Sequence, residues 1–143
     1  MIQKLQKITT LLVLMMVLSG CTNNPEDYLE HLEGYWEIER VILNDGSTKE
    51  YSYNDTVDFI SLEDSQTGIR KKMKPNFMGT FETSKDAENF TIKIENDSMN
   101  VYYKTPFDTW KETVLLATKN QLKVINKNNA IFLYKRYKPI SIN

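Results

Sequence analysis

The chain has 143 residues, and its 18 lysines and arginines against 19 aspartates and glutamates give a formal charge of −1. This balance lacks the basic excess that nucleic-acid binding requires, so we expect no nucleic-acid partner. The single cysteine, Cys21, excludes an internal disulfide.

The N-terminus combines a short positive segment with an apolar run. Lys4 and Lys7 precede an apolar stretch over residues 11–18. A membrane-spanning helix needs about 20 apolar residues, so this stretch is too short to span a bilayer. Its length and its flanking residues are typical of a secretory signal peptide, which we predict over residues 1–20.

The apolar run ends in Leu-Ser-Gly-Cys at residues 18–21, which resembles the lipobox of bacterial lipoproteins. The resemblance implies a lipid on the thiol of Cys21, cleavage before this residue, and a tether to the membrane over residues 21–24. Thr22 stands where an aspartate would retain such a protein at the inner membrane. This implies the outer membrane of a Gram-negative cell envelope, with the face left open. The alternative is an ordinary signal peptide with an incidental cysteine.

Residues 25–143 have the length of one domain, and the domain begins with a predicted two-turn helix over residues 25–32. Asn24 suits the position that caps a helix, and Pro25 suits its first turn. Gly34 then ends the helix, because glycine readily leaves the helical conformation.

After Gly34 apolar and polar residues alternate with period two, as in half-buried strands, and Asp45-Gly46 is typical of a hairpin turn. We predict strands over residues 36–42, 57–62, 69–74, 77–81, 90–95, 99–104, 110–118, 121–125 and 130–137. No segment between them is long enough for a parallel crossover. The predicted fold is therefore all-β, an antiparallel up-and-down meander of about 8 strands that closes into a barrel. An open sandwich is the alternative.

The junction between helix and first strand contains Gly34-x-Trp36, which resembles the Gly-x-Trp signature of lipocalins. In that family a short helical turn precedes the signature, as residues 25–32 do here. The resemblance implies that Trp36 plugs the closed end of the barrel and that an arginine from the last strand packs across its ring. Arg136 occupies the matching position. The whole chain resembles the small lipocalin-like lipoproteins of Gram-negative bacteria.

The sequence carries no motif for catalysis, for a cofactor or for a metal, and we expect an enzyme only if polar side chains converge inside the barrel. His31 is the only histidine and lies in an acidic helix, so we interpret it as a solvated helix residue. A basic cluster, Arg70-Lys71-Lys72 with Lys74, either attracts an anionic ligand or forms a solvated strand face.

Inward positions of a barrel either pack solid or line an apolar cavity, and periodicity alone does not distinguish the two. The clean alternation over residues 90–95 and 99–104 favours two inward rows, with Lys93, Glu95 and Lys104 on the opposite face. The candidate cavity residues are Phe59, Phe81, Phe90, Ile92, Ile94, Met99, Val101, Tyr103 and Trp110.

Two functions follow from this pattern. The first is a membrane-anchored binding module for a small apolar or amphipathic ligand. The second is a structural or accessory lipoprotein whose packed barrel meets a protein partner through its outer surface. Thr56 and Ser98 each follow an aspartate in a turn and resemble sites that some Gram-negative bacteria O-glycosylate, although aspartate, serine and threonine favour turns in any case.

Overall fold

The computed structural model describes residues 1–4 and 23–139, so most of the expected signal peptide and the whole lipobox, with Cys21, lie outside the described residues. The helical elements are η1 (Pro25–Tyr28) and α2 (Leu29–Leu32). The strands are β1 (Gly34–Ile42), β2 (Thr48–Glu50), β3 (Val57–Leu62), β4 (Thr67–Pro75), β5 (Phe81–Thr83), β6 (Glu88–Glu95), β7 (Ser98–Lys104), β8 (Thr109–Ala117), β9 (Gln121–Asn126) and β10 (Ile131–Arg136).

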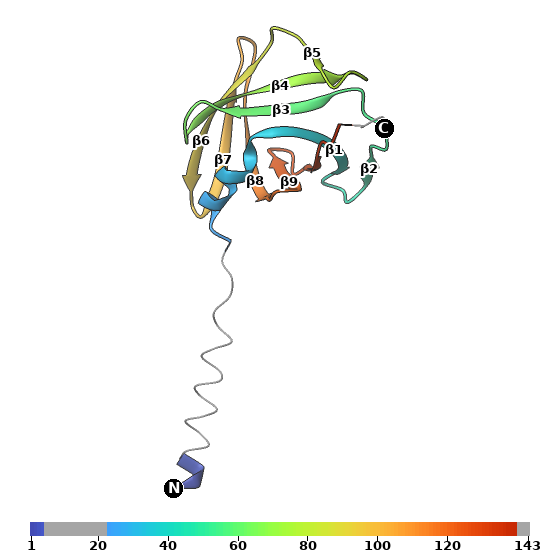
Figure 1. The fold of residues 1–143 in the computed structure, drawn as a ribbon. Coiled ribbons are helices and arrows are strands. Elements are labelled where there is room, and N and C mark those ends of the chain that lie inside the picture. Colours follow the sequence, from blue (N-terminus) through green and yellow to red (C-terminus); the bar gives the residue numbers. More distant parts are fainter. Residues whose placement is uncertain (5–22, 140–143) are drawn as a thin grey trace.

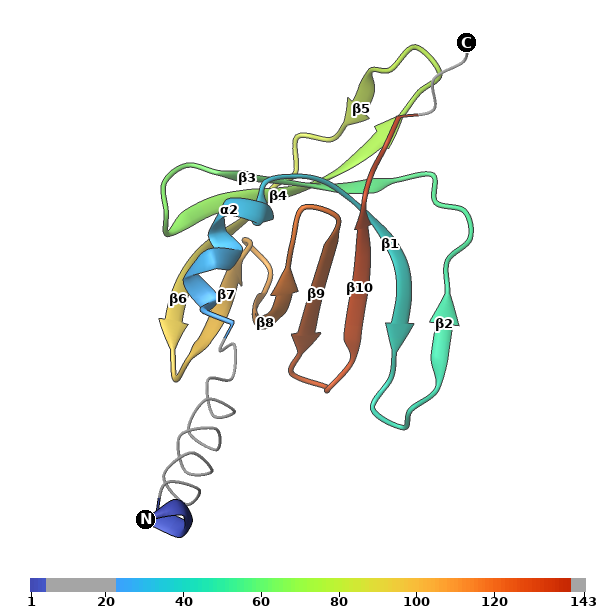
Figure 2. The same ribbon diagram turned by 60° about the horizontal axis from the view of Figure 1, so that its bottom comes forward.

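A short helical segment opens the domain, as the sequence predicts, although its first half is a 3₁₀ helix. Asn24 caps η1, since its side chain accepts a hydrogen bond from the Glu26 N–H at 3.3 Å. Tyr28 and Leu32 are buried, and the Tyr28 hydroxyl donates to the Leu115 carbonyl of β8 at 3.1 Å. The segment therefore lies against β7 and β8 and covers this part of the barrel (Figure 2).

The sheet closes on itself. Its strands follow the order β10-β9-β8-β7-β6-β4-β3-β1, and β1 also pairs with β10 over the length of the last strand. All of these pairings are antiparallel, and Figure 1 shows β3 and β4 running side by side over the remaining strands. The predicted eight-stranded antiparallel barrel is confirmed. The open-sandwich alternative is wrong, because the β1–β10 pairing leaves no edge between the first and last strands.

Two short strands lie outside the closed ring. β2 pairs with the end of β1, and β5 pairs with the end of β4 and projects beyond the barrel (Figure 2). The strand predicted over residues 77–81 is wrong, because residues 76–80 form a turn. The Asn76 side chain accepts hydrogen bonds from the N–H groups of Met78 and Thr80, at 3.0 and 3.1 Å, and this fixes the turn just before β5. Such capping by asparagine is a local interaction that alternation of apolar residues does not report.

One edge of β1 is shared between two partners. Residues 34–36 pair with β3, whereas residues 40–42 pair with β2. Asn54 bridges the gap between them, since its amide nitrogen donates to the Ile38 carbonyl at 2.9 Å and to the Glu37 carboxylate at 3.2 Å. The segment that joins β2 to β3 is thereby held beside the barrel wall, where it forms one side of the pocket described below.

The core fills the part of the barrel nearest the helical segment. Trp36 and Met99 are its largest fully buried side chains, and Phe90, Ile92 and Val101 pack in the same cluster. In the part of the chain that the structure describes, no helix is long and apolar enough to cross a bilayer.

Candidate functional site

Trp36 and Arg136 meet at the end of the barrel that the helical segment covers. The Arg136 guanidinium carbon lies 3.7 Å from the centroid of the Trp36 ring, and the Trp36 indole N–H donates to the Leu32 carbonyl at 2.8 Å. The guanidinium also donates to the carbonyls of Lys119, Glu33 and His31, at 3.0, 2.5 and 2.9 Å. This is the contact that the Gly-x-Trp resemblance implies. It ties the helical segment to the last strand and leaves this end of the barrel closed.

The residues proposed to line an apolar cavity lie in different parts of the molecule. Five of them are buried in the core cluster: Phe90, Ile92, Met99, Val101 and Tyr103. These residues lie on β6 and β7. They pack in one cluster with Tyr28 and Leu32 of the helical segment and with side chains of β8 and β9. Ile94, which continues the same row, is 41% exposed because it lies beyond this core at the β6–β7 hairpin.

Phe59 and Phe81 do not face the interior either. Asp58 and Ile60 point inward beside β1, and successive side chains of a strand point to opposite faces, so Phe59 lies on the outer face. There the Tyr35 ring packs against Phe59 and Phe81, with ring centroids 4.7 and 4.4 Å apart. The reason is that β5 pairs with the end of β4 and brings Phe81 against Tyr35, so that the three rings form a partly buried cluster outside the core.

Trp110 lies near the start of β8, whereas the helical segment contacts Leu115 near the end of this strand. Its ring stacks on Tyr103, with centroids 5.0 Å apart and planes 10° from parallel. It is only partly buried and packs against the margin of the core. It therefore extends the core toward the open end, and the mouth pocket described below does not include it.

Charged side chains cross the interior of the barrel above the core. Arg70 of β4 forms ion pairs with Glu88 of β6 at 2.5 Å and with Glu112 of β8 at 3.1 Å. Because β6 and β7 separate β4 from β8 in the sheet, the contact with Glu112 must pass through the interior. The Arg70 guanidinium also lies 4.2 Å from the Tyr103 ring. The basic cluster is therefore split, since Arg70 points inward and its neighbour Lys71 points outward.

A pocket of about 430 Å³ opens at the mouth of the barrel, above Trp36. Its walls come from β1, β3, β4, β10 and the segment that joins β2 to β3. Seven of its twelve lining residues are apolar or aromatic: Trp36, Ile38, Val41, Tyr51, Tyr53, Phe132 and Tyr134. The polar part consists of Asn54, Asp55, Thr56, Asp58 and Lys72. The candidate glycosylation residue Thr56 thus lies at the pocket, whereas Ser98 lies at the β6–β7 hairpin.

Asp58 is the polar group set most deeply in this pocket. Its side chain is buried, and its Oδ1 has no hydrogen-bond donor among the described residues. The Nζ of Lys72 lies 2.5 Å from this oxygen, but the pair lacks hydrogen-bond geometry. Burial, and secondarily the charge of Asp58, raises the pKa of the nearby Tyr134 phenol, so this ring stays neutral in the pocket.

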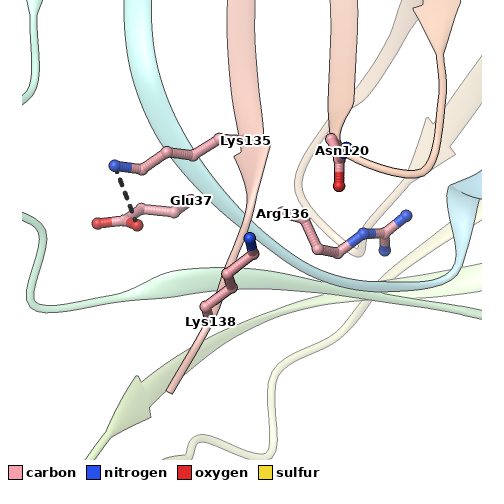
Figure 3. Close-up of a pocket in the computed structure, with 5 residues that line it drawn as sticks. All are labelled: Glu37, Asn120, Lys135, Arg136 and Lys138. Atoms are coloured by element: carbon pink, nitrogen blue, oxygen red, sulfur yellow. Dashed lines mark ion pairs between the residues drawn. The ribbon is translucent and has the colours of Figure 1, made fainter. Parts of the chain in front are cut away.

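Two further depressions are weaker candidates. One, of about 330 Å³, is lined by Glu37, Asn120, Lys135, Arg136 and Lys138 (Figure 3). Lys135 and Glu37 pair with each other at 3.6 Å, and the Arg136 guanidinium turns away from them toward the carbonyls that it binds. The other is a groove of about 520 Å³ between the β2–β3 segment and the β4–β5 turn, where Tyr53 and Phe77 are exposed.

Sequence reasoning missed Asp58, Tyr134 and the segment over residues 51–56. The available signal was the alternation in β3 and β4, which puts Asp58 on one face with Ile60, and Arg70 on one face with Lys72. Both faces of β3 carry apolar residues, and in β4 the apolar Ile69 and Met73 lie on the face opposite Arg70, so alternation alone does not identify the inner face.

The fold defines the class of this protein, a closed antiparallel β-barrel of eight strands with a short helical segment at one end. No known protein family and no curated protein matches the sequence. Among solved structures, the chain is similar to a lipocalin-like protein from Bacteroides uniformis, with a TM-score of 0.47 and 8% sequence identity. The similarity covers 74% of this chain and 98% of that chain.

Proposed function

We propose that this protein is a lipid-anchored binding module of the bacterial cell envelope, which takes a small amphipathic ligand into the mouth of its barrel. The observation that carries the proposal is the pocket of about 430 Å³ above Trp36. Pockets for small molecules have volumes of about 300–1,000 Å³ and combine apolar walls with a few polar groups. The ligand therefore needs an apolar body for the aromatic walls and a polar group for Asp58.

The anchor and the location are supported by the sequence alone. The Leu-Ser-Gly-Cys motif at residues 18–21 favours a lipid on Cys21, and Thr22 favours the outer membrane of a Gram-negative cell. We do not propose catalysis, although polar side chains do converge inside the barrel. Glu88 and Glu112 are both engaged with Arg70, and an acid–base pair at work on a substrate would have to leave that partner.

The binding proposal is tested with a neutral fluorescent probe, N-phenyl-1-naphthylamine, titrated into the full chain in phospholipid nanodiscs. We expect saturable uptake beyond that of empty nanodiscs. Thr56→Trp, which places a large ring in the pocket, should weaken uptake about tenfold, equivalent to about 1.4 kcal/mol. Thr91→Trp adds the same ring on the exposed outer face of β6 and should leave uptake unchanged.

Native mass spectrometry of the protein purified from its own source gives an independent reading, because a retained ligand appears as added mass. Uptake that does not saturate, or that responds equally to both tryptophan variants, would contradict the binding proposal.

A second function is favoured by a separate observation. Tyr53, Phe77 and Met78 are 84%, 90% and 85% exposed beside the groove of about 520 Å³, and such side chains are typical of contact surfaces between proteins. In this case the protein is an accessory lipoprotein that meets a partner through its outer surface. Phe77→Ser separates the two functions, because it should leave probe uptake unchanged and weaken only association with a protein.

A further inference from the structure

We infer that the mouth pocket selects an organic cation, a small amine with an apolar body, and that Asp58 is the group that binds its ammonium. The inference rests on the proposed binding function and names the chemistry of the ligand. Three features of the pocket support it: the state of Asp58, the aromatic walls and the balance of charge.

Asp58 is the strongest of these features. The residue is 5% exposed, and its Oδ1 is sealed from water without a hydrogen-bond donor among residues 23–139. Buried carboxylate oxygens are normally satisfied by donors, because their desolvation is costly. Asp58 also lines the pocket directly. The donor that it lacks is therefore one that a ligand in the pocket would supply.

Lys72 currently provides only a charge to Asp58. Its ammonium lies 2.5 Å from Oδ1 without hydrogen-bond geometry, and its side chain is 69% exposed. Because the Lys72 side chain reaches into solvent, its ammonium returns to water when another ammonium takes its place beside Asp58. A ligand ammonium that enters the pocket can displace Lys72 and donate to Asp58 in its place.

The walls of the pocket are rich in aromatic rings, whose faces attract cations. Tyr51, Tyr53, Phe132 and Tyr134 line the pocket together with Trp36. Two of these rings already hold cations of the chain itself. Arg136 lies 3.7 Å from the centroid of Trp36, and Lys49 lies 4.9 Å from that of Tyr51. Aromatic rings and a carboxylate that line the same pocket suit an amine with an apolar body.

The balance of charge points the same way. The interior carboxylates are Asp58, Glu88 and Glu112, and the cations that pair with them are Arg70 and Lys72. Among the charged residues that line the pocket, Asp55 and Asp58 are negative and Lys72 is positive, so the lining carries an excess of negative charge. Arg70 is engaged with two carboxylates, so it offers little to an anion. An anionic ligand would therefore meet repulsion, whereas a cation restores neutrality.

The experiment compares three probes of nearly the same shape: 2-phenylethylamine, 2-phenylethanol and phenylacetate. Each is titrated into the full chain in phospholipid nanodiscs, with empty nanodiscs as the blank, and binding is followed by NMR. We expect the amine to bind at least tenfold more tightly than the alcohol, and phenylacetate to bind most weakly. Asp58→Asn should reduce the affinity for the amine to that for the alcohol, whereas Asp86→Asn, a neutralised exposed carboxylate, should change neither.

Lys72→Gln is the second variant, and it should change the affinity for the amine in the direction opposite to Asp58→Asn. Removal of the competing ammonium should raise the affinity for the amine several-fold and leave that for the alcohol unchanged. If Asp58→Asn fails to fold, as judged by circular dichroism, this variant decides the question alone: a gain for the amine only supports the inference, and an equal effect on amine and alcohol overturns it.

The failures are distinguishable. Equal affinity for amine and alcohol, or preference for phenylacetate, would overturn the inference and leave the binding function standing. The same holds if none of the three binds while N-phenyl-1-naphthylamine still does. If no probe of either experiment binds, the inference fails together with the proposed function.

Discussion

Gly34 shows how a single residue connects the helical segment to the barrel. Its φ is +117°, a conformation that other residues rarely adopt, and a β-carbon at this position would lie 2.5 Å from Nη1 of Arg136. The guanidinium can rest on Trp36 and bind the Glu33 carbonyl only because this space is empty. The glycine of the Gly-x-Trp pair is therefore required by both the backbone and its neighbour.

We predict that Gly34→Ala destabilises the domain by about 1–3 kcal/mol, the usual cost of a strained backbone conformation, with displacement of Arg136 adding to it. Gly46→Ala is the matched control, since its φ is also positive, at +82°, but nothing lies within 4 Å of the added carbon. Urea unfolding of both variants gives the comparison. An equal loss of stability in the two variants would show that the Arg136 contact contributes nothing.

Tyr103 and Tyr134 carry phenols whose pKa values are raised, chiefly by burial. The folded state thus favours the neutral phenol, so the stability from these groups is fully present below the ordinary tyrosine pKa of about 10 and is lost at higher pH. We predict that at about pH 11 the folded protein shows less phenolate absorbance at 295 nm than the same protein in guanidinium chloride.

The variant with Tyr103→Phe and Tyr134→Phe should lose most of this difference. Tyr53 is exposed in the folded protein, and Tyr53→Phe is therefore the control that should leave the difference unchanged. If the folded and unfolded proteins titrate alike, the two phenols are not shielded.

Strand β4 brings charged side chains into the interior of the barrel. It carries Arg70 into the barrel, where the guanidinium binds carboxylates from β6 and β8. The strand therefore connects opposite sides of the wall above the apolar core. It also carries Lys72 to the mouth pocket, beside Asp58 of its neighbour β3.

We predict that Arg70→Met lowers the free energy of unfolding by about 3–5 kcal/mol, because it leaves Glu112 without a partner inside the barrel. Arg70→Met combined with Glu112→Met should cost less than the sum of the two single changes. The control is Arg40→Met, which breaks an exposed pair with Glu50 (2.6 Å) and should cost less than about 1 kcal/mol. Urea denaturation provides the measurement, and equal losses for Arg70→Met and Arg40→Met would contradict the interior role of Arg70.

At the scale of the whole molecule, the proposed function needs the barrel held at a membrane, and that part rests on Cys21. A chain attached through two or more lipid chains stays on the membrane, whereas one lipid chain holds it only marginally.

We predict that Cys21→Ser abolishes lipid labelling and cleavage and removes the protein from the membrane fraction. Metabolic labelling with a fatty-acid analogue, followed by fractionation and mass measurement, tests this. Ser19→Ala keeps a small residue before the cleavage point and should be processed normally. A Cys21→Ser protein that is still shortened and still lipid-labelled would mean that the lipoprotein interpretation is wrong.

The sequence by itself determined the features that depend on neighbours along the chain. Period-two alternation and short turns predict an antiparallel meander, since each hairpin brings adjacent strands together. Asn24 and Pro25 likewise predict the start of the helical segment through local capping. The pairing of Trp36 with Arg136 was available only from the family resemblance, because the two residues are far apart in the chain.

Only the tertiary structure decided which face of β3 and β4 is inside and where the barrel is empty. Alternation assigns Asp58 and Phe59 to opposite faces of β3. Both faces carry apolar residues, so the pattern does not identify the buried face. The structure places Asp58 within and Phe59 outside, where Phe59 packs against Tyr35, which in turn stacks on Phe81 of β5. The same holds for the pocket: whether inward side chains meet or leave space depends on the closure of the ring and on the split of β1 between β2 and β3. These are long-range contacts that no local pattern encodes.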